Sequence, residues 1–445
     1  MELIHNGTLV NEGLAQRGFL VINGGFIARV GAGDPSQELI DVCDTVTDVD
    51  GAYIIPGVID DHVHMREPGL TRKATIATES RACVAGGITS FMDMPNVNPV
   101  TVTEQAWAHK MQRAAETSVA NYSFYIGATN SNIDTLQSLD YSRIPGVKVF
   151  MGSSTGGMLV NDAAALKQIF AQIKTVVAVH CEDEDIISSN RKALVAERGD
   201  DLPVTLHTTI RSEEACYKST ELAVRLAREC GTRLHVLHIS TARELELFSK
   251  KFPNITCEAC VGHLWFSDED YSRLGNRIKV NPSIKTIADR DALRKAVNQG
   301  VISVIATDHA PHLPAEKDGN CITAASGMPM AQFVLPVMME LAMQGVLSVE
   351  TVVQRMCHAP ARVFGIDRRG FLRPGYYADV AIVRRDTEPH TITDDQVLSL
   401  CGWTPLNGTT LHHTVAMTYV NGHRAWDNGT LSDELNARPI KFKRL

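Results

Sequence analysis

Short apolar runs alternate with helix-like segments through the middle of this 445-residue chain. Each run has the length of a buried β-strand, and the segments between the runs repeat apolar residues at the spacing of a helix face. Regular alternation of strands and helices predicts a parallel sheet, and eight such units predict a TIM-type (β/α)8 barrel. The eight predicted strands contain residues 58–59, 88–94, 122–127, 147–150, 176–179, 234–237, 255–259 and 301–306.

Both ends of the chain have a different pattern, with short strands separated by turns. Residues 19–22 run into Asn23-Gly24 and residues 415–420 run into Asn421-Gly422, and Asn-Gly is a strong turn signal between strands. We therefore expect the two ends to pair into one small β-sandwich domain beside the barrel. The expected division gives residues 1–52 and 371–445 to the β-sandwich and residues 53–370 to the barrel.

Composition and charge narrow the class of protein. The formal net charge of −8 provides no basic surface for nucleic acid, and no apolar run approaches the ~18 residues that span a membrane. The first residues lack the basic and apolar segments of a secretion signal. Ten cysteines are scattered singly, which indicates reduced thiols and a cytoplasmic protein. Cys257 and Cys260 have no second pair nearby, so we interpret them as buried packing groups rather than zinc ligands.

The stretch from Ile54 to Gly69 starts as an apolar strand and then turns abruptly polar. Residues two apart in a strand point to the same side, so His62, His64 and Arg66 project together from the strand end. Two adjacent imidazoles suit a divalent metal, and an arginine beside them suits a carboxylate or phosphate. Taken alone, the stretch is also consistent with two structural histidines beside a surface arginine.

Other predicted strands also end in potential metal ligands, and the carboxyl ends of barrel strands meet at one face. Imidazole nitrogens with a carboxylate favour zinc over magnesium or calcium, which prefer oxygen ligands. One catalytic zinc needs three protein ligands and a water, so the larger number of ligands here makes two metals plausible. The residues collected in this way are His62, His64, Lys148, His180, His238 and Asp308.

Lys148 is unusual because Val147 and Val149 flank it on a strand that reads as buried. One interpretation is a lysine that reaches solvent from the strand end. The other is a buried lysine whose pKa is lowered by desolvation, which makes the amine nucleophilic. Addition of carbon dioxide would convert such an amine into a carbamate, a carboxylate-like bridge between two metals.

Six motifs in order along the chain resemble the dihydroorotases of the amidohydrolase superfamily. They are DxHxHxREPG at 60–69, DMPN at 93–96, VKVFMGSSTG at 147–156, HCEDE at 180–184, HIST at 238–241 and TDHAPH at 307–312. The resemblance implies two zinc ions per subunit, one held by His62 and His64 and the other by His180 and His238. It also implies that carboxylated Lys148 and a hydroxide bridge the metals, and that Asp308 is both a metal ligand and the catalytic proton carrier.

The same resemblance implies a substrate and its contacts. The reaction would be reversible hydrolysis of the cyclic amide of (S)-dihydroorotate to N-carbamoyl-L-aspartate, in de novo pyrimidine (UMP) biosynthesis. From sequence position alone, turn or capping roles are the better interpretation of Asn96 and Asn281. Residues 311–328 form a polar stretch that we expect to be a long loop over the barrel mouth. Carboxylate contacts are implied for Arg66, Asn96 and His312, and further substrate contacts for Asn281, Ser326 and Gly327.

Two kinds of alternative stay open at this point. Allantoinases and dihydropyrimidinases, or hydantoinases, share the fold and the chemistry, but their uncharged rings would give Arg66 and His312 no carboxylate partner. A non-catalytic scaffold relative would have lost metal ligands, whereas all six are present. The expected partner is therefore a small molecule with a carboxylate, with no nucleic acid and no membrane. Members of the family are often homodimers, which makes a homodimer the expected assembly.

Overall fold

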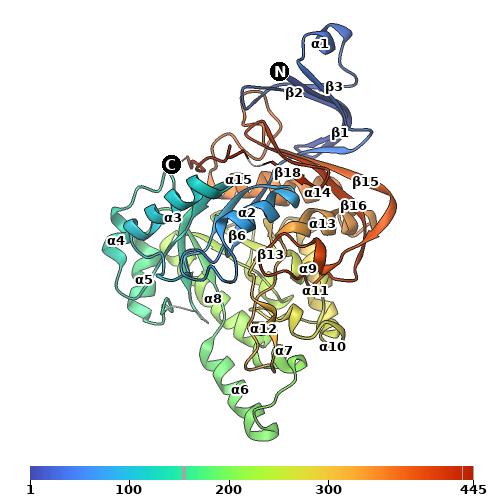
Figure 1. Ribbon diagram of the computed structural model, residues 1–445. Helices are drawn as coiled ribbons and strands as arrows, with labels where there is room; N and C mark the ends of the chain where they lie inside the picture. The colour runs from blue at the N-terminus through green and yellow to red at the C-terminus, as the bar shows by residue number, and fades with distance from the viewer. Residues whose placement is uncertain (153–156, 433, 444–445) are drawn as a thin grey trace.

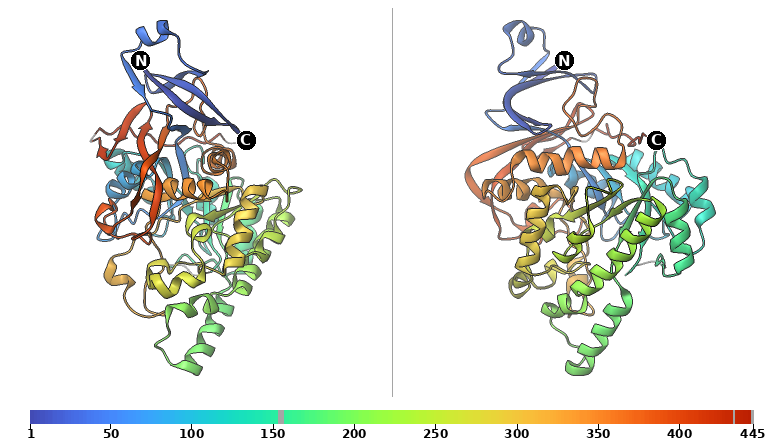
Figure 2. Two further views of the ribbon diagram at one scale, coloured as in Figure 1. Left: turned by 90° about the vertical axis from the view of Figure 1, so that its right-hand side faces the viewer. Right: turned by 180° about the vertical axis from the view of Figure 1, so that it is seen from behind.

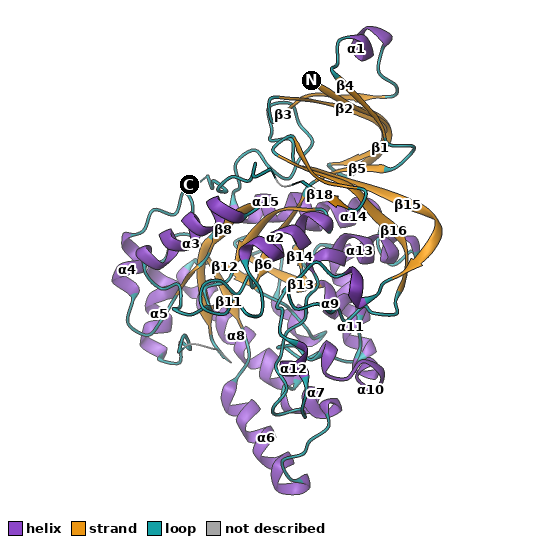
Figure 3. Ribbon diagram, in the orientation of Figure 1, coloured by secondary structure: helices purple, strands orange, loops and turns teal. Residues whose placement is uncertain are grey.

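The computed structural model describes residues 1–152, 157–432 and 434–443 (Figure 1). The end of the VKVFMGSSTG motif, residues 153–156, lies outside the described residues. A parallel barrel, a ring of helices around it and a mixed sheet at one end make up the molecule (Figures 1 and 3). The mixed sheet contains both ends of the chain, as the blue and red strands of Figure 2 show.

The central strands pair in parallel and form the barrel that the alternation of runs predicts. A parallel bridge between Val63 and His309 joins the last strand region to the first. Strands such as Val176–His180 are buried along their whole length, as expected when helices cover the outer face and side chains fill the interior. Within the described residues the barrel strands are β6 (Val58–Val63), β7 (Ile88–Asp93), β8 (Asn121–Phe124) continuing into β9 (Ile126–Gly127), β10 (Gly146–Phe150), β11 (Val176–His180), β12 (Arg233–Val236), β13 (Ile255–Cys260) and β14 (Val304–Ala306).

The helices start and end at recognisable caps. For the helix Glu213–Cys230, Ser212 accepts a hydrogen bond from the Ala215 amide, and Gly231 ends the helix in the left-handed conformation at φ 70°. No helix among the described residues is long and apolar enough to cross a membrane. The α-helices are α1 (Gln37–Asp41), α2 (Ile76–Ala85), α3 (Glu104–Thr117), α4 (Ile133–Ser138), α5 (Ala163–Gln172), α6 (Glu184–Arg198), α7 (His207–Ile210), α8 (Glu213–Cys230), α9 (Val261–Trp265), α10 (Tyr271–Leu274), α11 (Ile287–Gln299), α12 (Pro314–Lys317), α13 (Val334–Met343), α14 (Val349–Val353) and α15 (Ala359–Phe364).

The chain ends form one continuous mixed sheet, in which β5 joins the N-terminal strands to the C-terminal ones. This sheet is the expected small β domain built from both chain ends, and in the described residues its order is β18-β17-β16-β15-β5-β1-β2-β3, with β4 on β1. The expected barrel segment starts at residue 53, whereas β5 pairs with β1 and β15 and the first barrel strand starts at Val58. The strands are β1 (Glu2–Asn11), β2 (Leu14–Asn23), β3 (Phe26–Ala32), β4 (Thr45–Asp48), β5 (Tyr53–Pro56), β15 (Val380–Thr391), β16 (Thr410–Val420), β17 (His423–Asp427) and β18 (Thr430–Leu431).

Candidate metal centre and substrate pocket

A cavity of about 420 Å³ opens where the barrel strands end. This volume is within the range of small-molecule sites. The strand ends bring residues to it that are hundreds of positions apart in sequence. All the site residues predicted from the sequence line this one cavity: His62, His64, Arg66, Asn96, Lys148, His180, His238, Asn281, Asp308, His312, Ser326 and Gly327.

One group of potential ligands centres on Asp308. Its Oδ1 atom lies 3.3 Å from His62 Nε2 and 3.1 Å from His64 Nε2. These two Nε2 atoms, called the inner nitrogens because they face the cavity, therefore converge with the carboxylate. The buried Asp60 carboxylate joins the two strand ends that carry them, because its Oδ2 accepts a 2.5 Å hydrogen bond from Thr307 Oγ1. Asp60 therefore positions the site without lining the cavity.

The outer nitrogens of these two histidines are held by oxygen atoms. His62 Nδ1 lies 2.6 Å from Glu258 Oε1, and His64 Nδ1 lies 2.9 Å from Asn96 Oδ1. A ring nitrogen that donates to an oxygen leaves the other nitrogen with its lone pair, which is the usual arrangement around a metal-binding histidine. Asn96 thus orients His64 at the cavity wall, and it also lies in the turn that the Val97 amide closes on the Pro95 carbonyl.

A second group of potential ligands lies across the cavity. His180 Nδ1 and His238 Nε2 face each other at 2.9 Å, and His180 Nε2 lies 3.0 Å from Glu182 Oε2. Arg211 forms an ion pair with the same carboxylate. Burial lowers the pKa of both histidines, so they are neutral at physiological pH, as metal binding requires.

Several strand-end residues have backbones in the left-handed region. The φ angles are 63° at Arg66, 38° at His238 and 46° at Asp308. Such angles are uncommon for residues with a Cβ atom and cost of order 1–3 kcal/mol each, so the surrounding structure must enforce them. They turn these three side chains into the cavity at the point where each strand stops.

Lys148 lies on β10 with 1% of its surface exposed, so it does not reach solvent. Its strand neighbours in register are Gly127, which has no side chain, and Ala178, which has a small one. Its Nζ atom lies 4.6 Å from the centre of the Phe150 ring. Desolvation lowers the pKa of Lys148 to about 8, so the neutral amine is far more populated near pH 7 than for an exposed lysine.

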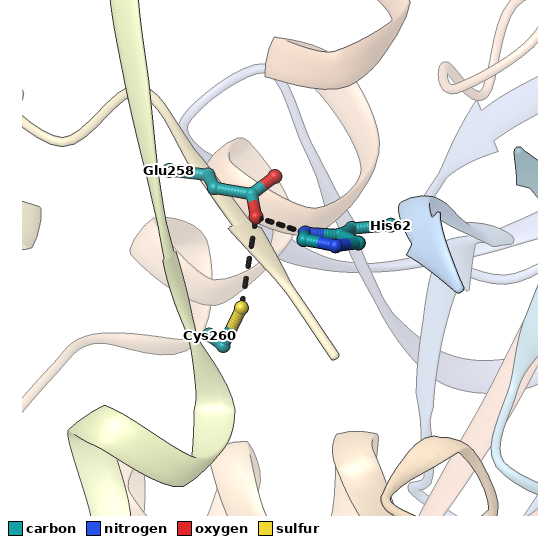
Figure 4. Close-up of side chains that lie close together, drawn as sticks. All are labelled: His62, Glu258 and Cys260. Carbon is teal, nitrogen blue, oxygen red and sulfur yellow. Dashed lines mark hydrogen bonds and ion pairs between the residues drawn. The ribbon is translucent and has the colours of Figure 1, made fainter. Parts of the chain in front are cut away.

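Glu258 is a site residue that sequence reasoning missed. Figure 4 shows its carboxylate between the His62 ring and the Cys260 thiol, whose Sγ lies 3.6 Å from Oε1. His235 Nε2 lies 3.2 Å from Asp61 Oδ2 and 3.5 Å from Glu258 Oε2, and all three side chains are fully buried. The sequence shows Glu258 as a carboxylate within the otherwise uncharged strand Ile255–Cys260. It does not show that this carboxylate contacts His62 of β6.

The opposite wall of the cavity is cationic. Arg66 Nε donates to the Pro311 carbonyl at 3.0 Å, and its Nη2 lies 3.1 Å from His312 Nε2. Lys73 Nζ, a second missed residue, lies 3.2 Å from His312 Nδ1. Burial and these two cations lower the pKa of His312 far below its usual range, so the ring is neutral. A neutral imidazole accepts at only one nitrogen, so the ring satisfies one of the two cationic donors. Lys73 also forms an ion pair with Glu316 at 3.1 Å, whereas Arg66 forms no ion pair within the described residues.

The donor set fits divalent metals. His62, His64 and Asp308 place ligand atoms within 4.8 Å of one another, and the His180–His238 pair adds two nitrogens across the cavity. Burial lowers the pKa of His64, His180 and His238, and neutral imidazoles are ligands that zinc and similar metals prefer. Lys148 lies in the same cavity as both groups.

Comparison with known proteins places the chain among enzymes. The sequence model of the amidohydrolase family matches residues 53–425. The dihydroorotase of Halobacterium salinarum is 37% identical over 384 residues, which cover 85% of this chain and 87% of that protein. The allantoinase of Bacillus velezensis is 30% identical, covering 96% and 94%. Among solved structures, the L-hydantoinase (dihydropyrimidinase) from Arthrobacter aurescens superposes with a TM-score of 0.90 at 25% identity, covering 99% of both chains.

Proposed function

The chain belongs to the amidohydrolase family, and from that premise we propose that it is a dihydroorotase. The reaction is reversible hydrolysis of the cyclic amide of (S)-dihydroorotate, which gives N-carbamoyl-L-aspartate. In the direction of ring closure this is a step of de novo pyrimidine synthesis. A homodimer in the cytoplasm is part of the proposal.

The cationic wall opposite the histidines is the observation that carries the proposal. Arg66 and Lys73 are both directed at the neutral His312 ring. Lys73 is also paired with Glu316, so among the described residues Arg66 is the cation of this wall that lacks a carboxylate partner. A carboxylate entering the cavity supplies the missing acceptor and neutralises charge that is buried with Arg66, which is 7% exposed. Dihydroorotate has this carboxylate, whereas allantoin and dihydrouracil do not.

Allantoinase activity is the second candidate, because a relative of that name is 30% identical over most of the chain. Allantoinase activity predicts turnover of an uncharged ring. Such a ring offers no ionic partner to the Arg66 guanidinium. Leaving such a buried cation unpaired opposes binding, so dihydroorotate is favoured.

We propose that two zinc ions would be held at this site by His62, His64, His180, His238 and a carboxylated Lys148. Asp308 is the sixth protein ligand. When bound, such a metal pair polarises a carbonyl and lowers the pKa of water towards neutrality. The proposal is supported by the convergent nitrogens and by the lowered pKa of Lys148, which favours the amine that adds carbon dioxide.

Asp308 moves the proton in this scheme. Burial raises the pKa of its carboxyl group, but the His62 and His64 rings outweigh burial and lower the pKa to about 2. Asp308 is therefore ionised at neutral pH and accepts a proton as water adds to the ring carbonyl. It then gives the proton to the ring nitrogen as the carbon–nitrogen bond breaks. Arg66, Asn96 and His312 hold the substrate carboxylate, and Asn281, Ser326 and Gly327 line the other side of the ring.

The test is an assay of the purified protein with dihydroorotate, allantoin and dihydrouracil, together with metal analysis. We expect turnover of dihydroorotate and two metal ions per chain. The Lys148→Ala variant should lose metal and at least about a hundredfold in kcat, because the proposed bridge is gone. Turnover of allantoin or dihydrouracil without dihydroorotate would refute the assigned substrate. Two tightly bound metals and full activity in Lys148→Ala would refute the carbamate.

A further inference from the structure

A second cavity of about 290 Å³ adjoins the first, and Asn281 and Ser326 line both. Its walls come from α6, α7 and the loop that contains residues 321–326. Figures 1 and 2 show α6 projecting from the barrel at the end opposite the mixed sheet. We name this cavity the basic cleft after three of its lining residues: Arg191, Arg211 and Lys279.

Positive charge in the basic cleft exceeds negative charge. One carboxylate, the exposed Glu184, lines it beside the three cations. Arg211 is engaged by Glu182, and Lys279 Nζ donates to the Ala324 carbonyl. Local positive charge stands out here because the chain as a whole has a net charge of −8.

Arg191 and Lys279 are the cations without a carboxylate partner. In the described part of the chain, neither the exposed Arg191 guanidinium nor the Lys279 ammonium forms an ion pair. Burial, together with smaller contributions from the Arg211 and Arg191 charges, lowers the pKa of Lys279 to about 8. Such mutual repulsion is relieved when an anion binds between the cations.

The remaining polar groups of the basic cleft are neutral. His207 Nε2 donates to the Val280 carbonyl at 2.8 Å, and burial lowers the pKa of this ring to about 3. Cys321 Sγ lies 3.9 Å from His207 Nδ1, and burial raises the pKa of the thiol. Neither group offsets the charge of the three cations.

We propose that the basic cleft binds a small carboxylate or similar oxyanion and serves as an approach subsite for the anionic substrate on its way to the metal centre. The identity of the substrate rests on the proposed function, but the anion site itself does not. Both forms of the substrate are anionic, and a cleft of opposite charge next to the reaction cavity raises their local concentration. Asn281 and Ser326, shared by both cavities, mark the passage between them.

The kinetic test is Arg191→Gln, because Arg191 is exposed and its replacement leaves the packing intact. We expect kcat/KM for dihydroorotate to fall roughly threefold at low ionic strength and to match the wild type near 0.5 M salt, as expected for a rim charge. An enzyme variant cannot change the equilibrium constant of the reaction. The kcat/KM for ring closure must therefore fall by the same factor as that for hydrolysis. Lys192→Gln is the matched control, because Lys192 is the exposed neighbour on α6 that does not line the cleft.

A structural test does not depend on activity. Holoenzyme crystals soaked in selenate should show an anomalous peak between Arg191 and Lys279 that Arg191→Gln weakens. No peak in the wild type would overturn the anion site. A peak combined with unchanged kinetics in Arg191→Gln would overturn the approach role and leave an adventitious ion only. If the wild type does not process dihydroorotate, the proposed function fails, whereas the peak still decides the anion site.

Discussion

At the scale of single residues, the site depends on what stands behind each functional group. Glu258 and Asn96 hold the outer nitrogens of His62 and His64, and Glu182 holds that of His180. The inner nitrogens therefore face the cavity with their lone pairs. These supporting contacts join residues up to 196 positions apart, which no local pattern in the sequence encodes.

Arg66 determines the choice of substrate in the proposed function. Arg66→Gln removes the charge but keeps a polar side chain, so kcat/KM for dihydroorotate should fall roughly 10–100-fold through a higher KM, the loss expected for a hydrogen bond to a charged group. Steady-state kinetics measure this. Arg72→Gln is the control, because Arg72 is largely exposed and its one ion pair among the described residues is with Glu316. Equal KM values in Arg66→Gln and the wild type would show that Arg66 does not hold the carboxylate.

His235 gives the protein a pH-dependent contribution to stability. Burial alone would lower its pKa, but the Asp61 and Glu258 carboxylates raise it to about 9, above the ordinary value of about 6.5. A group whose pKa is higher in the folded protein than in the unfolded chain stabilises the fold fully at pH values below its unfolded-state pKa. This stabilisation is lost as the pH rises towards the folded-state pKa. We therefore expect the free energy of unfolding to fall between about pH 6.5 and pH 9.

The measurement is urea unfolding of chelator-treated protein across that pH range. His235→Gln should be less stable than the wild type at pH 6 and should lack this component of the pH dependence, because glutamine does not titrate. Identical slopes for the two proteins would show that His235 is not held as a cation between the carboxylates.

At the scale of elements, the apolar runs predicted the barrel strands because a strand buried on both faces requires almost continuous apolar residues. Helix α6 was not predicted, since only Ile187 and Leu194 of its fifteen residues are buried, and a polar helix has little periodicity. Its visible signal was Asp183, which caps the Ile186 amide, followed by two acidic residues in the first turn. The basic cleft was missed for the same reason.

The loop of residues 311–328 places Gly327 against the cavity. Gly327 has a φ of 139°, and a Cβ there would lie 2.7 Å from the Ala310 carbonyl oxygen and 2.9 Å from His312 Cδ2. Gly327→Ala should displace His312 and lower kcat/KM by about tenfold, because a small misplacement at a binding group is costly.

Gly345→Ala is the matched control for this loop. Gly345 also has a positive φ, 74°, but a Cβ there meets nothing within 4 Å. Both variants should lose about 1–3 kcal/mol of stability from backbone strain, measured by urea unfolding, and Gly327→Ala should lose more because its Cβ also meets the Ala310 carbonyl oxygen. Only Gly327→Ala should lose activity, and equal activity in the two variants would remove the loop from the site.

At the scale of the whole molecule, a buried polar network joins the mixed sheet to the barrel. Asp379 forms an ion pair with Arg369 and accepts hydrogen bonds from Asn121 Nδ2, at 3.2 Å, and from the Asn421 amide, at 2.8 Å. It therefore connects the start of β8 with the loops on both sides of the C-terminal strands. The pairing of the chain ends was predictable from their shared strand pattern, but this polar junction was not, because its members are separated by up to 300 residues.

Asp379→Asn leaves the Arg369 guanidinium, which is 2% exposed, without its counter-charge. Breaking a buried pair in this way costs about 3–5 kcal/mol, so the urea midpoint should fall strongly. Asp427→Asn is the control, because its pair with Arg424 is partly exposed and should contribute less than about 1 kcal/mol. Equal stability of the two variants would show that the junction does not hold the sheet to the barrel.

The most direct test of the proposed function is the ratio of kcat/KM for dihydroorotate to that for dihydrouracil, measured with the zinc-loaded protein. The two rings differ by the carboxylate that Arg66 and His312 are proposed to bind, so all other contributions cancel. We predict that dihydroorotate is favoured at least a hundredfold, about 3 kcal/mol, and that Arg66→Gln removes most of this preference. A ratio near one, or a preference for dihydrouracil, would contradict the assignment of a carboxylated ring as the substrate.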